Sequence, residues 1–257
     1  MSANGRVAII SDLHSNIEAL SKVLTDIDAQ KIDRIFCLGD VVGYGPNPRE
    51  VIDKLDRCEF VLRGNHEEAL LFMALDFHND AARAIEWTRD QLNDGTQDKK
   101  VNHRLWNLIS ELPDYAEREN GDWVFVHASP RDRTKEYVRP IDVVDKPKLR
   151  EIFSMFKHVC FYGHTHEPGI FTDDLRFFSP VSFAQGRAKL VPNRKFLINV
   201  GSVGQPRDRD TRACYIVFDG EMVEFRRVEY DYRQTMQKIY ATQVIPRKFG
   251  DRLAIGK

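Results

Sequence analysis

The first third of the chain alternates short apolar runs with longer segments whose apolar residues recur at helical spacing. The runs lie at 6–11, 34–38 and 59–62, and their unbroken apolar character predicts strands buried on both faces of a sheet. The apolar positions of the first intervening segment are Ile17, Leu20, Val23, Leu24 and Ile27, which fall on one helical face. The second intervening segment starts at Pro48, which suits a first helical turn, and continues with Val51, Ile52 and Leu55. The pattern predicts a β-α-β-α-β unit.

The strand pattern stops after this unit and returns near residue 115. Residues 68–113 predict two or three helices, for example over 81–92 and 101–112, and we interpret them as a helical insertion that flanks a site. The later strand-like runs lie at 115–119, 123–126, 159–162, 169–172, 176–183, 196–200, 213–218 and 222–230. Further helical patterns cover 147–156, 231–241 and 246–255. Without a repeat, low-complexity tract or linker, the pattern predicts a single domain over 1–257.

Composition narrows the class of protein. The chain has 257 residues, 42% of them hydrophobic, which is enough for a sizeable core. Its net charge of −1 argues against stable binding of nucleic acid through a basic face. The four cysteines never form a Cys-x-x-Cys pair, and three lie in apolar runs, so we interpret these as reduced core cysteines. No signal-peptide pattern or membrane-length apolar run is found, and we expect a cytoplasmic protein without a membrane partner.

Polar side chains, most of them carboxylates and imidazoles, gather where the predicted strands end. They are Asp12, His14, Asp40, Asn65, His66, His127, His164 and His166, and they include five of the eight histidines of the chain. Each of them alone has an ordinary explanation, since an Asp after a strand is often a helix N-cap and an Asn is often a turn residue. A fold needs caps, but it does not need histidines at four strand ends. The sites of open α/β sheets lie at these ends.

This set contains imidazoles and carboxylates but no thiolate. Such ligands bind borderline divalent ions such as Mn, Fe, Co, Ni or Zn. Seven of these side chains are plausible ligands, which is too many for one tetrahedral ion and suits two ions that share a bridging carboxylate. Such pairs serve phosphatases and nucleases, because they lower the pKa of a bound water and neutralise phosphate oxygens. A serine nucleophile is a poor alternative, since the chain has no Gly-x-Ser-x-Gly elbow.

The order of these motifs resembles the calcineurin-like metallophosphoesterase family. The chain carries Asp12-Leu13-His14, Gly39-Asp40, Gly64-Asn65-His66, His127 and Gly163-His164-Thr165-His166, in the order in which the family has these motifs. The segment 199–207 further resembles the small bacterial and archaeal phosphodiesterase branch. The resemblance implies an α/β fold: a four-layer α/β/β/α sandwich of two mixed β-sheets flanked by helices, holding two divalent transition-metal ions.

The resemblance also implies roles for single residues. Asp12, His14 and His166 would hold one metal, Asn65, His127 and His164 the other, and Asp40 would bridge them. His66 would be a catalytic non-ligand that donates to the phosphate or protonates the leaving oxygen. The next residue, Glu67, either orients that imidazole or is a solvated carboxylate at a helix start.

The preferred function is a phosphodiesterase on a small, nucleotide-like phosphorylated substrate, with direct attack of hydroxide on phosphorus. The alternatives are a serine/threonine-type protein phosphatase or phosphomonoesterase, a nuclease, and a non-catalytic scaffold on the same fold. For substrate contacts we single out Asn65, Tyr44 and Arg207. Other loop residues with the same potential are Asn47, Arg131, Arg133 and Gln205, for which surface salt bridges or turns are the alternative. The sequence leaves the oligomeric state open.

Overall fold

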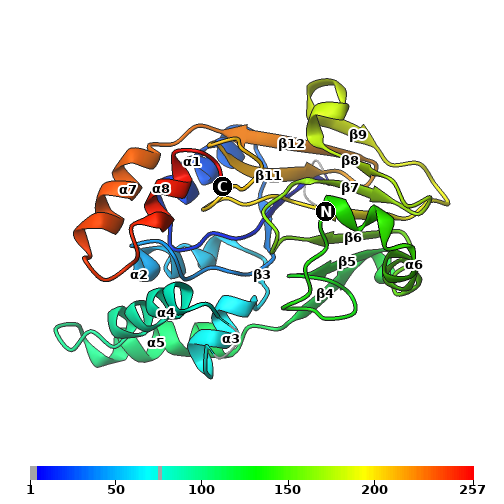
Figure 1. The fold of residues 1–257 in the computed structure, drawn as a ribbon. Coiled ribbons are helices and arrows are strands. Elements are labelled where there is room, and N and C mark those ends of the chain that lie inside the picture. The colour runs from blue at the N-terminus through cyan, green and yellow to red at the C-terminus, as the bar shows by residue number, and fades with distance from the viewer. Residues whose placement is uncertain (1–4, 75–76) are drawn as a thin grey trace.

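The computed structural model describes residues 5–74 and 77–257, and it places two six-stranded β-sheets face to face between layers of helices (Figure 1). Both sheets contain parallel and antiparallel neighbours. The α/β/β/α sandwich of two mixed sheets, which the motifs implied through resemblance, is therefore confirmed.

The first sheet has the strand order β3-β2-β1-β11-β12-β9. Its strands are β1 (Val7–Ile10), β2 (Arg34–Cys37), β3 (Phe60–Val61), β9 (Arg187–Lys189), β11 (Ala213–Phe218) and β12 (Met222–Val228). β1, β2 and β3 run parallel, as the predicted β-α-β-α-β unit requires, whereas β11 pairs antiparallel with β1.

The second sheet has the order β4-β5-β6-β10-β7-β8. Its strands are β4 (Tyr115–Arg118), β5 (Trp123–Val126), β6 (Val159–Tyr162), β7 (Gly169–Thr172), β8 (Phe177–Phe178) and β10 (Phe196–Asn199). β5, β6 and β10 are parallel, and β4 forms an antiparallel hairpin with β5.

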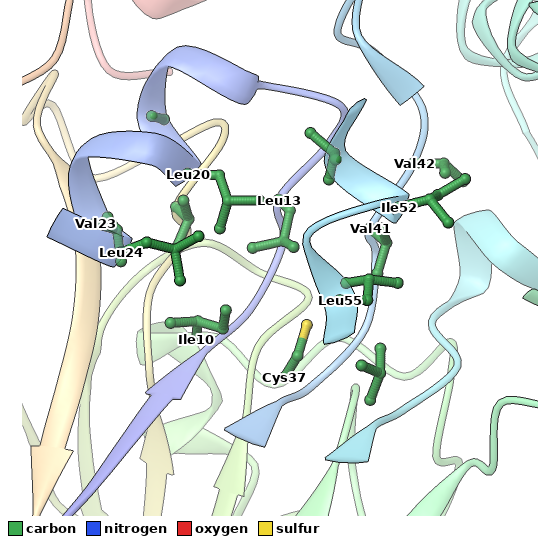
Figure 2. Close-up of a cluster of buried hydrophobic side chains, with 14 of the residues drawn as sticks. Ile10, Leu13, Leu20, Val23, Leu24, Cys37, Val41, Val42, Ile52 and Leu55 are labelled. Carbon is green, nitrogen blue, oxygen red and sulfur yellow. The ribbon is translucent and has the colours of Figure 1, made fainter. Parts of the chain in front are cut away.

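The helices are α1 (Ile17–Ala29), α2 (Pro48–Ile52), α3 (Asn65–Leu71), α4 (Asn79–Leu92), α5 (Lys99–Ser110), α6 (Lys146–Ser154), α7 (Tyr232–Ala241) and α8 (Lys248–Leu253). The predicted apolar face of α1 is buried, with Leu20, Val23 and Leu24 packed over Ile10 and Cys37 of the first sheet (Figure 2). Helix α6 covers the outer face of the second sheet. None of the helices in the described parts of the chain combines the length and the apolar character needed to cross a membrane.

Alternation along β1 explains why the strand is apolar throughout. Val7 and Ile9 point into the core between the sheets, where they join Phe125 and Phe161 of the second sheet. Ala8 and the other outward residues of β1 pack beneath the helices. Because both faces are covered, neither can carry polar side chains. Cys37, Cys160 and Cys214 are buried and free, which confirms the expectation of reduced core cysteines.

The structure differs from the sequence predictions in three places. The strand predicted over 176–183 is only Phe177–Phe178, because Pro180 has no N–H for a ladder and starts a 3₁₀ turn. Leu55 belongs to a 3₁₀ turn that follows α2, not to the helix itself. Strand β9 was missed because only Ala188 of its three residues is buried, so no apolar pattern marks it.

The chain connections bring five polar motifs to one edge of the sandwich. Three of them follow the parallel strands β1, β2 and β3 of the first sheet, and two follow β5 and β6 of the second. Helix α3 begins with Asn65, so the third of these motifs lies in the first turn of a helix.

Candidate metal centre

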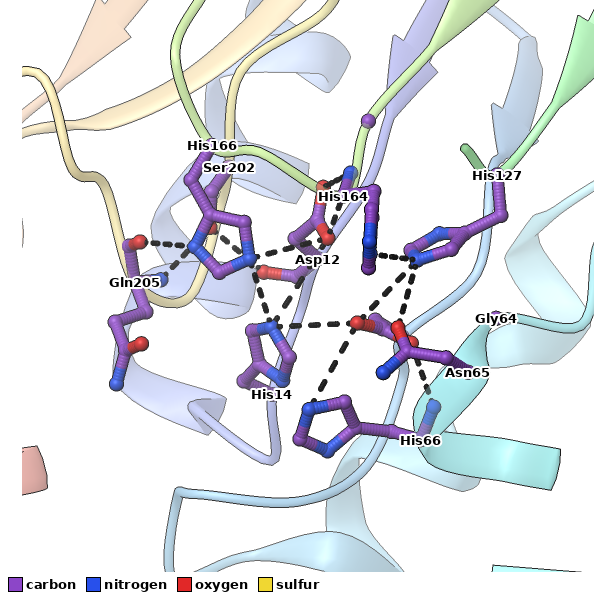
Figure 3. A network of polar contacts seen from close by, with 12 residues as sticks. Asp12, His14, Gly64, Asn65, His66, His127, His164, His166, Ser202 and Gln205 are labelled. Carbon is purple, nitrogen blue, oxygen red and sulfur yellow. Dashed lines mark hydrogen bonds and ion pairs between the residues drawn. The ribbon is translucent and has the colours of Figure 1, made fainter. Parts of the chain in front are cut away.

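The eight polar residues from the strand ends lie together at this edge of the sandwich (Figure 3), and all of them are buried except Asn65, which is half-buried. Two groups of ligand atoms have all members within 4.8 Å of one another: Asp12, His14, Asp40 and His166 form the first, and Asp40, His127 and His164 the second. Asn65 joins the second group, since its Oδ1 lies 3.2 Å from Nε2 of His127. Asp40 is the member that both groups share.

The backbone of this cluster is strained. Five of its residues have φ in the left-handed region that side chains disfavour: Asp12, His14, Asp40, His164 and His166. Such a conformation costs on the order of 1–3 kcal/mol per residue and persists only where the surroundings enforce it. Here the backbone amides of Asp12 and His14 donate to carbonyls of Gly39 and Asp40 at 2.9 Å, which ties the end of β1 to the end of β2.

The glycines of two motifs are needed for close approach to the carboxylates. A Cβ on Gly163 would lie 2.4 Å from Oδ2 of Asp12, and a Cβ on Gly64 would lie 2.1 Å from Oδ1 of Asp40. Their neighbours then reach the same carboxylates, because the amides of His164 and His66 donate to Asp12 at 3.1 Å and to Asp40 at 3.0 Å. The Gly-His-x-His and Gly-Asn-His spacings therefore let backbone N–H groups hold the two carboxylates.

Backbone carbonyls set the tautomer of four histidines. Nδ1 of His14 lies 3.2 Å from the carbonyl of Val42, and Nδ1 of His127 lies 3.0 Å from that of Leu38. A carbonyl only accepts, so each Nδ1 must donate, and each Nε2 turns a lone pair toward the centre. His166 follows the same rule, with Nδ1 2.5 Å from the carbonyl of Gln205.

His164 is held the other way round. Its Nε2 lies 3.1 Å from the carbonyl of Lys135, so its Nδ1 faces the centre. The inward nitrogens of His127 and His164 are 3.1 Å apart, and those of His14 and His166 are also 3.1 Å apart. Two lone pairs at this distance repel each other unless a cation or a proton lies between them. The donor set and this geometry fit two divalent cations, one for each pair of histidines.

Burial and charge set the protonation of the centre. Burial lowers the pKa of His14 well below its ordinary value and that of His164 to about 3, so both are neutral at pH 7. Burial also acts to lower the pKa of His127, but the carboxylates of Asp40 and Asp12 outweigh it and raise this pKa to about 9. In the metal-free protein His127 therefore carries a proton in the place that a cation would take.

His66 lies in the cluster but is held differently from the other imidazoles. Its ring packs edge-on against Tyr44 at 4.4 Å and Phe77 at 5.0 Å, and no backbone carbonyl of residues 5–74 and 77–257 holds it. It is 2% exposed, so it is not a surface residue. Nδ1 of this ring is buried without a hydrogen-bond partner among the described residues. Burial lowers the pKa of His66 to about 4, which keeps the ring neutral at pH 7.

Glu67 fits neither role suggested by the sequence. It is fully buried, and its carboxylate accepts from the backbone amides of Gly64 at 2.8 Å, Asp40 at 2.9 Å and Val42 at 3.1 Å. It thus holds the chain around Asp40 rather than the imidazole of His66. Burial and the nearby charge of Asp40 raise the pKa of Glu67 to about 7. In the sequence, the only sign of this role is that Glu67 stands three residues after Gly64, which is the N3 position of a capping box.

Two of the predicted substrate contacts lie beside the cluster. The ring of Tyr44 is 4.6 Å from that of His14, and the guanidinium of Arg207 lies 5.8 Å from the Tyr44 ring. Arg207 donates to Gln205 at 2.9 Å, and it has no carboxylate partner among residues 5–74 and 77–257. Sequence reasoning missed Arg252, whose pKa is lowered by burial and by Arg207, because its position near the C-terminus shows no motif.

Three other candidates lie away from the centre. Arg131 pairs with Glu136 and Glu151, and Arg133 pairs with Asp114 at 3.0 Å. Asn47 donates to Glu50 at 2.8 Å. For these residues the salt-bridge and turn alternatives are the ones that the structure supports.

Known proteins resemble this chain over nearly its whole length. A sequence model of the calcineurin-like phosphoesterase superfamily domain matches residues 6–222. An uncharacterized protein of Methanocaldococcus jannaschii is 36% identical over 260 residues, which cover 98% of each protein. The crystal structure of a metallophosphoesterase from Sphaerobacter thermophilus is 34% identical, with a TM-score of 0.79 over 98% of this chain and 99% of that one. A hypothetical protein from Pyrococcus horikoshii OT3 has the same fold, with 20% identity and a TM-score of 0.71 over 98% of both chains.

The proton on His127 predicts how metal binding depends on pH. Below its pKa of about 9, the protonated ring must lose its proton before it can ligate. The apparent affinity of the metal-free protein for Mn²⁺ should therefore rise from pH 7 to pH 9, by up to about tenfold per unit, and level off above. Calorimetry at pH 7.5 in two buffers of different ionisation enthalpy should also show proton release. An affinity that stays flat over this range would contradict a protonated His127.

Glu67→Gln should loosen the centre. An amide presents only one acceptor oxygen, so at least one of the three backbone N–H groups loses its partner, which costs about 1–3 kcal/mol. We expect a lower free energy of unfolding at pH 8 and weaker binding of Mn²⁺. Glu86→Gln on α4, where the carboxylate is 61% exposed, is the matched control and should change neither. Unchanged stability and metal affinity in Glu67→Gln would show that the three hydrogen bonds are dispensable.

Proposed function

Because this chain belongs to the calcineurin-like phosphoesterase superfamily, we propose that it hydrolyses phosphoesters with two divalent transition-metal ions, and that its substrates are small, nucleotide-like phosphodiesters. The observation that carries this proposal is the pair of ligand groups that share Asp40. A shared carboxylate between two clusters of inward-facing imidazoles suits a two-metal site.

We propose the following ligands, which the two groups of donors support. Asp12, His14 and His166 would hold one ion, and Asn65, His127 and His164 the other, with Asp40 between them. Imidazole and oxygen donors favour Mn, Fe, Co, Ni or Zn. When bound, two such ions would lower the pKa of a coordinated water to near neutrality and neutralise phosphate oxygens.

The protein itself contributes hydrogen-bond donors around the phosphate. His66 is neutral at pH 7, so it suits the role of an N–H donor to a phosphate oxygen better than that of a proton source. Arg207, without a carboxylate partner in the described chain, offers a guanidinium to a nonbridging oxygen. The hydroxyls of Ser11 and Ser15 have no hydrogen-bond partner among residues 5–74 and 77–257, so neither has a base that could activate it. This supports direct attack by water on phosphorus.

The size of the opening beside the centre supports a small substrate. A cavity of about 220 Å³ is lined by Asn65 and His164 together with seven neighbours. Pockets for drug-sized ligands are usually about 300–1,000 Å³, so this space suits one substituent of a phosphoester better than a segment of a folded protein. The net charge of −1 likewise gives no support to a polymeric nucleic-acid substrate.

Metal content and activity test the proposal together. After reconstitution with Mn²⁺, elemental analysis should find about two ions per chain, and the protein should hydrolyse bis(p-nitrophenyl) phosphate. Asp40→Ala should lose both metal and turnover, because it removes the donor common to both groups. Asp56→Ala, an exposed aspartate beside β3, is the control and should match the unmodified protein. Two ions retained in Asp40→Ala would refute the shared ligand, and absence of metal after reconstitution would refute the site.

His66→Ala separates catalysis from metal binding. The variant removes a donor but no ligand, so it should keep about two ions while kcat falls by about 10²–10⁴-fold. His103→Ala, on the exposed side of α5, provides the comparison and should leave kcat unchanged. Full activity in His66→Ala would exclude the proposed role, and thermal melting should be recorded for both variants to verify folding.

A further inference from the structure

The small cavity beside the metal centre has an unusual lining. Its inner end is formed by the candidate ligands Asn65 and His164. Its outer walls carry large apolar side chains that water reaches, since Phe72 is 70% exposed and Met73 is 69% exposed. Exposed apolar side chains that adjoin a candidate reaction centre mark a surface that a ligand covers.

Two of the aromatic rings that line this cavity contact the centre. The ring of Tyr137 lies 4.1 Å from that of His164, and the loop that carries it is fixed by the bond between His164 and the carbonyl of Lys135. The ring of Phe77 lies 5.0 Å from that of His66. A substituent on a phosphorus atom at the centre would therefore lie close to these aromatic rings.

The charge of the cavity points to an uncharged occupant. Among the described residues of its lining, Glu68 and Lys135 are the charged ones, and Nζ of Lys135 lies 3.9 Å from Oε2 of Glu68. Thr134 also donates to Glu68 at 3.1 Å, which joins the two walls. Without excess charge, the lining does not attract a second phosphate.

A larger groove of about 1,070 Å³ is lined in part by Arg207, but it is a poorer candidate for this substituent. None of the proposed metal ligands lines it, and its walls are rich in charged residues such as Arg226, Arg227 and Asp210. Most of these are already paired with one another or with neighbours. A substituent on a phosphorus atom at the metal centre is adjacent to the small cavity instead.

We infer that the cavity bounded by Phe72, Phe77 and Tyr137 is a subsite for a planar, uncharged aryl or heteroaryl substituent of the phosphoester substrate. This inference rests on the proposed function, because it needs the phosphoryl group to lie at the metal centre. Aromatic rings stack on planar groups whatever their substituents, and each such stack contributes measurable affinity. The subsite would make the enzyme prefer nucleoside-like and aryl esters over alkyl esters.

Phosphonates test the subsite without turnover, since their carbon–phosphorus bond is not hydrolysed by a phosphoesterase. Calorimetry on the Mn²⁺-loaded protein should compare methylphosphonate, cyclohexylphosphonate and phenylphosphonate. We expect phenylphosphonate to bind about tenfold more tightly than methylphosphonate, with the non-planar cyclohexyl compound between them. In Phe72→Ser and in Tyr137→Ser the ratio of the methylphosphonate to the phenylphosphonate dissociation constant should fall from about ten toward one, whereas Tyr137→Phe should keep the ratio of the unmodified protein.

The matched control is Val181→Ser, since Val181 is 93% exposed and lines the larger groove. It should keep the phenyl preference. Equal affinity for phenylphosphonate and methylphosphonate in the unmodified protein would overturn the subsite but leave the phosphoryl site intact. Failure of all three phosphonates to bind would overturn the proposed function and the subsite with it. Self-association that Phe72→Ser abolishes in sedimentation experiments would assign the apolar surface to a second copy of the chain and overturn the inference.

Discussion

The carboxylate of Asp40, desolvated among imidazoles, is the interaction around which the site is built. Its Oδ2 lies 3.4, 3.7 and 3.9 Å from the Nε2 atoms of His127, His14 and His66. A buried carboxylate is costly unless cations or donors compensate it. His127 supplies that compensation as a cation in the metal-free protein, and divalent ions would do so in the loaded one. The pKa of Asp40 accordingly lies well below its ordinary value, because His127 and His66 outweigh the opposing effect of burial.

The surrounding structure serves to keep this carboxylate and its imidazoles in place before any ion binds. Carbonyls from three loops, among them the loop between β2 and α2, fix the ring orientations of His14, His127, His164 and His166. Glu67 binds the backbone on both sides of Asp40. Left-handed backbone at several ligand positions costs free energy that the sandwich core must offset. Preorganisation of this kind reduces the rearrangement that metal binding would otherwise require.

The two sides of the centre differ in what they offer a substrate. The side of Asn65 and His164 opens to a small cavity with exposed aromatic walls. On the side of His14 and His166, the Tyr44 ring packs against His14 and the Gln205 carbonyl holds His166, with the guanidinium of Arg207 nearby. Under the proposed function, charge recognition and shape recognition would thus be separated across the metal centre. This asymmetry gives a physical basis for selecting among esters that share the same phosphoryl group.

Much of this protein was readable from its residues alone. Apolar periodicity predicted β1, β2 and α1, because a strand covered on both faces and a helix with one buried face leave clear local patterns. The strand-end motifs predicted which imidazoles and carboxylates would meet, since parallel strands present their carboxyl ends at one edge. Short elements such as β9 left no pattern, because one buried side chain does not define a period.

The tertiary structure decided what depends on contacts between distant segments. The carbonyls that fix each imidazole come from residues up to 89 positions away, as for His127 and Leu38, and no local pattern encodes them. The reversed ring of His164, the backbone contacts of Glu67 and the approach of Arg252 to Arg207 arise in the same way. The sequence by itself determined the chemistry of the donors and their place at strand ends. Packing of the two sheets decided which donor faces which, because orientation is set by neighbours that are remote along the chain.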